Sequence, residues 1–187
     1  MAESSRMAGI KEGIMFCKNN AERLLRDAHI LFENGKHVSS FLLSQLSLEE
    51  EAKAFRLVQK QLKGKTFSKK EWEDFAYSHE EKLRYIQRVV DELDADMVRR
   101  STGIDYWQVL KKMYKGMGEK NLENHRKKVS EDLKKFRNTR LYTDYDFEER
   151  SWTDANQIDL ASSLRSKIMA ERMLEYLDYR ISELRKE

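Results

Sequence analysis

A short polar segment near the middle of the C-terminal half could bind a phosphate ester. Residues 137–142 read Arg-Asn-Thr-Arg-Leu-Tyr and close a basic stretch of the chain. The guanidinium of Arg137 could neutralise phosphate charge while the Tyr142 hydroxyl donates a hydrogen bond, with Asn138 beside them. An arginine that packs on the tyrosine ring, or that pairs with Asp144, is an equally compatible interpretation.

A histidine at an expected helix start is a second candidate. His79 is followed three residues later by Lys82. The N-terminus of a helix favours anions, and a lysine close to it would help to hold a phosphate. A lone histidine at such a position is more often a surface or capping residue. This pattern alone therefore does not single out His79 as catalytic.

Three consecutive glutamates are followed by Lys53 in a helical segment. Helical spacing places Glu49 and Lys53 on one face and predicts an ordinary ion pair between them. Alternatively, one of the carboxylates points into the protein, where burial would demand a polar partner. Asn20 and Asp27, seven residues apart on another helix, could supply that partner.

Several other kinds of site are not expected. The seven glycines are scattered, so no glycine-rich phosphate loop is present. The four histidines at positions 29, 37, 79 and 125 are far apart, and no metal site or cofactor is predicted. Cys17 is the single cysteine and lies on an apolar stripe, which predicts an inert thiol.

The elements that must position these residues are helices. Apolar residues recur at spacings of three and four over residues 10–31 and again over 38–62, and Gly35 and Gly64 follow the two stripes. This pattern predicts an antiparallel helical hairpin. Ser68 with Glu71, and Ser78 with Glu81, form the capping-box pattern that opens two further helices.

The C-terminal part is expected to hold an aromatic loop and a last helix. Residues 138–153 read as a structured loop rich in aromatic side chains, and residues 154–187 as a helix capped by Thr153 or Asp154. No strand is predicted. The sequence therefore predicts a single all-α domain, a helical bundle over residues 1–187.

Composition indicates where the protein acts and how its charges are distributed. The chain has 187 residues, no proline and a net charge of +3, and 37% of its residues are charged. No apolar run is long enough to span a membrane and no apolar signal region opens the chain, so a cytoplasmic protein is expected. The small net charge hides an asymmetry, because residues 111–140 hold 11 basic and 4 acidic side chains whereas residues 141–159 hold 1 and 6. The basic stretch is either a solvated helix face or a surface that follows a phosphate backbone.

Four motifs together resemble the AbiV-type abortive infection family. They are Asn20-Ala21-x-x-Leu24-x-x-Asp27-Ala28-x-x-Leu31-x-x-x-Gly35, Glu49-Glu50-x-x-Lys53, His79-x-x-Lys82-Leu83 and Leu141-Tyr142-x-Asp144-Tyr145. That family is similar to HEPN domains. The resemblance implies an all-α HEPN-like bundle, a homodimer, and an antiphage role in which the infected cell stops protein synthesis. It also implies functional roles for the polar residues of the four motifs.

HEPN ribonucleases carry an arginine, often followed by asparagine, and a histidine four to six residues after the arginine. Arg137-Asn138 fits the start of that motif, and Tyr142 stands where the histidine would be. An imidazole exchanges protons near pH 7, whereas a phenol does not, so another group such as His79 would have to transfer the proton.

Three functions are therefore compatible with the sequence. The first is an antiphage effector that blocks translation by binding or cleaving RNA, including RNA of the ribosome. The second is a protein-binding module without enzymatic activity, which senses or sequesters a phage-encoded protein. The third is a magnesium-dependent nucleotide pyrophosphohydrolase that uses carboxylates on facing helices, against which Lys53 argues.

Overall fold

The computed structural model describes residues 2–102, 124, 144–146, 151–153, 158 and 160–184. Side chains are described for residues 9–93, 124, 158 and 160–184. The helices are α1 (Ala2–Glu33), α2 (His37–Leu62), α3 (Lys69–Ala76), α4 (His79–Thr102) and α7 (Leu160–Glu183). The fold is all-α, as the sequence predicts.

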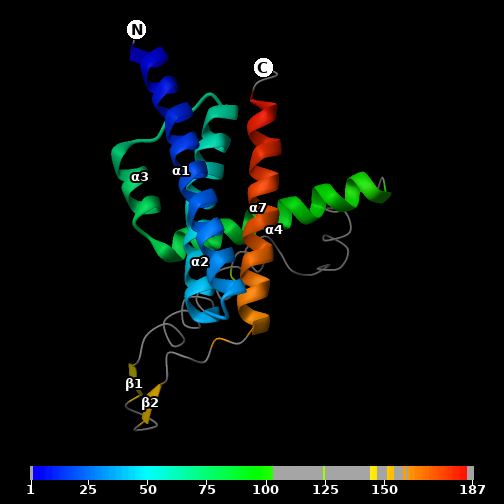
Figure 1. Ribbon diagram of the computed structural model, residues 1–187. Helices are drawn as coiled ribbons and strands as arrows, with labels where there is room; N and C mark the ends of the chain where they lie inside the picture. Colours follow the sequence, from blue (N-terminus) through cyan, green and yellow to red (C-terminus); the bar gives the residue numbers. More distant parts are fainter. Residues whose placement is uncertain are drawn as a thin grey trace.

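The N-terminal hairpin is confirmed. Gly35 separates α1 from α2 with a φ of 71°, a left-handed conformation that glycine adopts without strain. Gly64 follows α2 with a φ of 59° and ends that helix in the same way. In Figure 1 α1 and α2 lie against one another, and α7 runs alongside them as the third long helix.

Small side chains bring α1 and α2 close together. Ala21 and Ala28 of α1 are fully buried, and so are the α2 serines that face them. The hydroxyl of Ser40 donates to the carbonyl oxygen of Ala28 at 2.8 Å. The Ser47 hydroxyl lies 2.9 Å from the carbonyl oxygen of Ala21. These hydrogen bonds fix the register of the hairpin and therefore the direction in which the glutamates of α2 point.

The core lies between α2, α4 and α7. Met173 and Leu177 of α7 are fully buried and belong to one apolar cluster with Leu48 of α2 and Ile86 of α4. Helix α4 crosses the other long helices and extends beyond them (Figure 1). This crossing brings the first turn of α4 to the middle of α2.

Ser68 and Ser78 cap the helices that they precede, as the sequence predicts. Ser68 accepts a hydrogen bond from the backbone N–H of Glu71, whose side chain in turn accepts from the Ser68 N–H, which completes a capping box before α3. Ser78 accepts from the backbone N–H of Glu81 at 3.1 Å, so it caps α4. The cap sets His79 as the first residue of α4.

The segment before the last helix differs from the expectation. Strands β1 (Asp144–Asp146) and β2 (Ser151–Thr153) pair in antiparallel register with Tyr145 opposite Trp152, so the absence of strands was a wrong prediction. Aromatic residues on opposite strands stabilise such a pair, a signal that three-residue strands are too short to display as alternation. Because Thr153 lies in β2 and α7 begins at Leu160, Thr153 does not cap the last helix.

None of the described helices carries an apolar stretch long enough to cross a membrane.

Candidate functional site

A buried carboxylate joins α2 to the first turn of α4. Glu49 accepts hydrogen bonds from Nδ1 of His79, which lies 2.8 Å from Oε1 and 2.7 Å from Oε2. The Nζ of Lys82 lies 2.8 Å from Glu49 Oε2. His79 and Lys82 are three residues apart on one face of α4, so both reach the same carboxylate. We call these three residues the Glu49 cluster.

Burial differs sharply within the Glu49 cluster. The side chains of Glu49 and Lys82 are 4% and 7% exposed, whereas that of His79 is 46% exposed. A buried carboxylate needs an opposite charge and hydrogen-bond donors, and Lys82 supplies both. The histidine is therefore the member of the cluster that reaches the surface.

The geometry selects a histidine tautomer. An ionised carboxylate only accepts hydrogen bonds, so His79 Nδ1 must carry the hydrogen that Glu49 accepts. Nε2 is then the ring nitrogen that does not face Glu49. A carboxylate that orients an imidazole in this way stabilises the imidazolium that forms during proton transfer. The arrangement can serve as a general base or acid.

The expected ion pair between Glu49 and Lys53 is not the one observed. Lys53 instead bonds Glu50, with 2.5 Å between Nζ and Oε1, and both side chains are 19% exposed. Consecutive residues of a helix point about 100° apart, so Glu49 faces α4 while Glu50 stays beside Lys53. The alternative that one carboxylate points into the protein is the correct one, and Glu49 is one of two that do.

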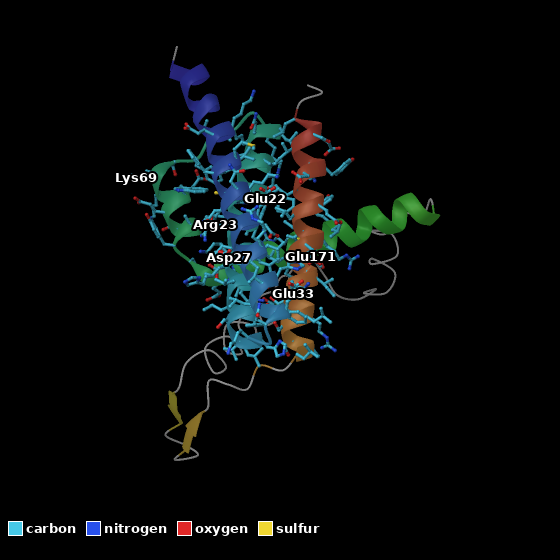
Figure 2. The ribbon with its side chains drawn as sticks, viewed as in Figure 1. Glu22, Arg23, Asp27, Glu33, Lys69 and Glu171 are labelled. Atoms are coloured by element: carbon cyan, nitrogen blue, oxygen red, sulfur yellow. The ribbon has the colours of Figure 1, made fainter. Side chains whose placement is uncertain are left out.

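Asn20 and Asp27 do not supply the partner that was expected of them. Both bond Arg23 on α1 instead, at 2.9 Å from Asn20 Oδ1 and 3.3 Å from Asp27 Oδ2. Figure 2 shows Arg23 and Asp27 following one another along α1. Their side chains are 56% and 47% exposed, so this is a surface network rather than a buried one.

Other predicted site residues fall outside the described part of the chain. Arg137, Asn138 and Tyr142 lie there, as does the basic stretch 111–140 apart from residue 124. Asp144 and Tyr145 belong to β1, of which the backbone alone is described. Their proposed roles therefore stay predictions.

A second buried glutamate was not singled out from the sequence. Glu51 is fully buried between the hairpin helices, and its Oε2 has no hydrogen-bond partner among the described residues. Burial raises its pKa to about 8, although a hydrogen bond with Ser47 opposes the shift. Ser47 Oγ lies 2.8 Å from Glu51 Oε1 and 2.9 Å from the Ala21 carbonyl oxygen.

The hydrogen count at Ser47 agrees with a protonated Glu51. A serine hydroxyl carries one hydrogen and cannot donate to two acceptors at once. If Glu51 is protonated, it donates to Ser47 Oγ, and Ser47 donates to the carbonyl oxygen of Ala21. In that arrangement Ser47 links Glu51 of α2 to the backbone of α1.

Glu51 should make stability depend on pH. Its pKa is 4.5 in the ordinary case and about 8 when folded, so between these values the folded chain binds more protons than the unfolded chain. The contribution of Glu51 to the free energy of unfolding is fully present below pH 4.5. It falls by at most about 1.4 kcal/mol per pH unit as the pH rises to 8. Glu51→Gln is expected to gain stability over the wild type across this range, measured by denaturant unfolding at pH 5, 6, 7 and 8. Glu50→Gln is the matched control, and parallel curves for Glu51→Gln and the wild type would contradict the assignment.

Two further observations concern other reactive side chains. Burial, aided by Glu50 and opposed by Lys53, raises the pKa of the Cys17 thiol to about 11, so the thiol is unreactive at neutral pH as expected.

Among the described residues no group of three or more His, Cys, Asp or Glu side chains could hold a metal ion.

A second histidine–carboxylate pair joins α1 to α7. His29 Nε2 lies 2.5 Å from Oε1 of Glu171, which Figure 2 labels on α7, and Lys167 Nζ lies 3.3 Å from His29 Nδ1. No local sequence pattern indicates this pair, because its members are 142 residues apart. Unlike His79, His29 lies within a helix rather than at its start, so it has no positive helix end beside it.

Comparison with known proteins identifies a family. The chain matches the HEPN family described as AbiV over residues 9–175, which includes α2, α3, α4 and most of α1 and α7. No curated protein and no solved structure matches the chain. The matched range covers most of the sequence and contains the whole Glu49 cluster. The chain belongs to the AbiV family of HEPN domains.

Proposed function

We propose that this protein is an antiphage abortive-infection effector that shuts down translation in the infected cell by binding and cleaving RNA. Membership of the AbiV family suggests a role in abortive-infection defence. The observation that supports the RNA chemistry is the Glu49 cluster, in which a partly exposed histidine is oriented by a buried carboxylate at the start of a helix.

The reaction that fits the Glu49 cluster is transesterification of RNA without a metal ion. His79 Nε2 takes the proton of a 2′-hydroxyl, the 2′-oxygen forms a bond to phosphorus, and the bond from phosphorus to the 5′-oxygen breaks. The 5′-oxygen receives a proton, which the imidazolium of His79 can return. Glu49 stabilises the imidazolium, and the positive end of α4 favours the phosphate.

The predicted residues outside the described part have a place in this proposal. Arg137 would neutralise the charge that develops on the phosphate, while Asn138 and Tyr142 would donate hydrogen bonds to its oxygens. The basic stretch 111–140 would follow the RNA backbone. We further propose that the protein acts in the cytoplasm as a homodimer, in which these residues meet the Glu49 cluster.

A translating extract tests the function as a whole. Purified full-length protein is added to the extract, with or without lysate of phage-infected cells as a source of trigger, and both protein synthesis and RNA integrity are followed. We expect synthesis to stop while specific RNA fragments accumulate. Unchanged synthesis and intact RNA in both conditions would refute the proposal.

A non-catalytic protein-binding module is the second candidate. Tyr142 in place of the histidine expected of HEPN ribonucleases favours it. So does the apolar stripe of α7, where Leu160, Leu164 and Ile168 are 54%, 37% and 43% exposed. Its partner would be a phage-encoded protein. If Arg137→Ala and Tyr142→Phe leave protection against phage intact while substitutions in the α7 stripe abolish it, this second function replaces the first.

A further inference from the structure

Tyr77 is the most exposed of the large hydrophobic side chains whose exposure is described, at 82%. Its ring has no hydrogen-bond or ring partner among the described residues. Single exposed aromatic residues are common on protein surfaces, so exposure alone does not indicate a role. The position of Tyr77 indicates a role, because Tyr77 lies two residues before His79.

The backbone around Tyr77 is held firmly on both sides. Tyr77 is the C-cap of α3, and its N–H donates to the carbonyl oxygen of Glu73 at 3.1 Å. Phe75, two residues earlier, is buried in the core cluster. Ser78, the next residue, caps α4. The ring is therefore presented to solvent from a fixed corner between two helices.

This corner holds an exposed aromatic residue two positions before the proposed proton-transfer group. His79 is fixed by Glu49, and its side chain is 46% exposed on the same junction. Unpaired bases of RNA stack on aromatic rings, whereas bases within a duplex are already stacked on their neighbours. A nucleotide whose 2′-hydroxyl approaches His79 could place its base on Tyr77.

We propose that Tyr77 is a stacking platform for an unpaired base next to the phosphodiester held at His79, so that the substrate is single-stranded RNA. This inference rests on the proposed function, because it assumes that RNA binds at the Glu49 cluster. It adds a residue that favours unpaired over paired strands. Since stacking tolerates every base, little sequence preference is expected from this contact.

Binding of short RNA tests the platform. The full-length protein carrying His79→Asn, which keeps the strand intact, is titrated into a fluorescently labelled eight-nucleotide oligoadenylate. Adding Tyr77→Ala is expected to weaken binding about tenfold, whereas Tyr77→Phe keeps the ring and should change it by less than about twofold. Phe16→Ala, which removes a 66% exposed ring from α1, is the matched control and should have no effect.

Two further arms separate the outcomes. Binding of a duplex of the same length should not depend on residue 77. An abasic substitution in the oligonucleotide should weaken its binding to the parent protein but not its binding to the Tyr77→Ala variant. If the parent binds RNA and Tyr77→Ala binds it equally well, the platform is refuted while the proposed function stands. Equal RNA binding together with a changed oligomeric state would show that Tyr77 is a contact between protein chains. If the parent binds no RNA, both proposals fail.

Discussion

Replacing Glu49 by glutamine is expected to lower the free energy of unfolding by about 3–5 kcal/mol, because it leaves Lys82 buried without a counter-charge among the described residues. The two side chains are 4% and 7% exposed, so water cannot compensate for the loss. Lys82→Met should cost a similar amount, since it leaves the carboxylate of Glu49 with the half-exposed His79 as its remaining partner in the Glu49 cluster.

The double variant separates burial of charge from other effects. Glu49→Gln combined with Lys82→Met removes both charges, and its stability is expected to lie within about 1.5 kcal/mol of the wild type. Guanidinium unfolding of the four proteins at pH 7 measures the coupling. Glu50→Gln, which breaks the partly exposed pair with Lys53, is the control and should cost less than about 1 kcal/mol. Strictly additive losses in the double variant would show that Glu49 and Lys82 do not form a buried pair.

The second large effect concerns RNA cleavage. His79→Asn is expected to reduce the rate by about 100- to 10,000-fold, the usual contribution of a general base or acid. The asparagine amide can still donate a hydrogen bond to Glu49, but it cannot exchange a proton near neutral pH. Because the imidazole is 46% exposed, the free energy of unfolding should change little.

His29→Asn is the matched control for His79→Asn. His29 is 39% exposed and bonded to Glu171, so the substitution removes a similar histidine–carboxylate contact at another place in the bundle. Cleavage by the His29 variant should equal that of the wild type. A loss of equal size in both variants would point to general destabilisation rather than to chemistry at His79.

The sequence predicted those parts of the fold that local signals determine. Gly35 and Gly64 end their helices because glycine adopts positive φ angles without strain, and both signals lie within a few residues of the helix they end. The Ser68–Glu71 capping box is likewise a contact across three residues. Such features do not depend on where distant elements lie.

Which of the glutamates at positions 49–51 are buried could not be predicted from the sequence, because their burial depends on distant elements. Glu49 is buried because the first turn of α4, some 30 residues later, brings His79 and Lys82 to it. Glu51 is buried because the serines of α2 let α1 approach closely. The helical period shows that the three side chains point in different directions, but not which direction another helix will occupy.

The prediction that Asn20 and Asp27 bind a buried glutamate was wrong for a related reason. Asn20 and Asp27 lie beside the apolar stripe of α1, a position from which they could supply a partner to a buried carboxylate. Arg23 lies between them along the helix and bonds both at the surface. Contacts across three or four residues of one helix form without help from the rest of the fold, and here they took precedence.

The central claim is that the Glu49 cluster cleaves RNA through His79, and analysis of the product ends tests it most directly. Purified full-length wild type and the His79→Asn variant are incubated with single-stranded RNA in the presence of a chelator, and the ends of the fragments are determined. We predict 5′-hydroxyl ends and 2′,3′-cyclic phosphate ends with the wild type, and intact RNA with the variant. Intact RNA with the wild type, or equal cleavage by the wild type and the His79→Asn variant, would contradict the claim.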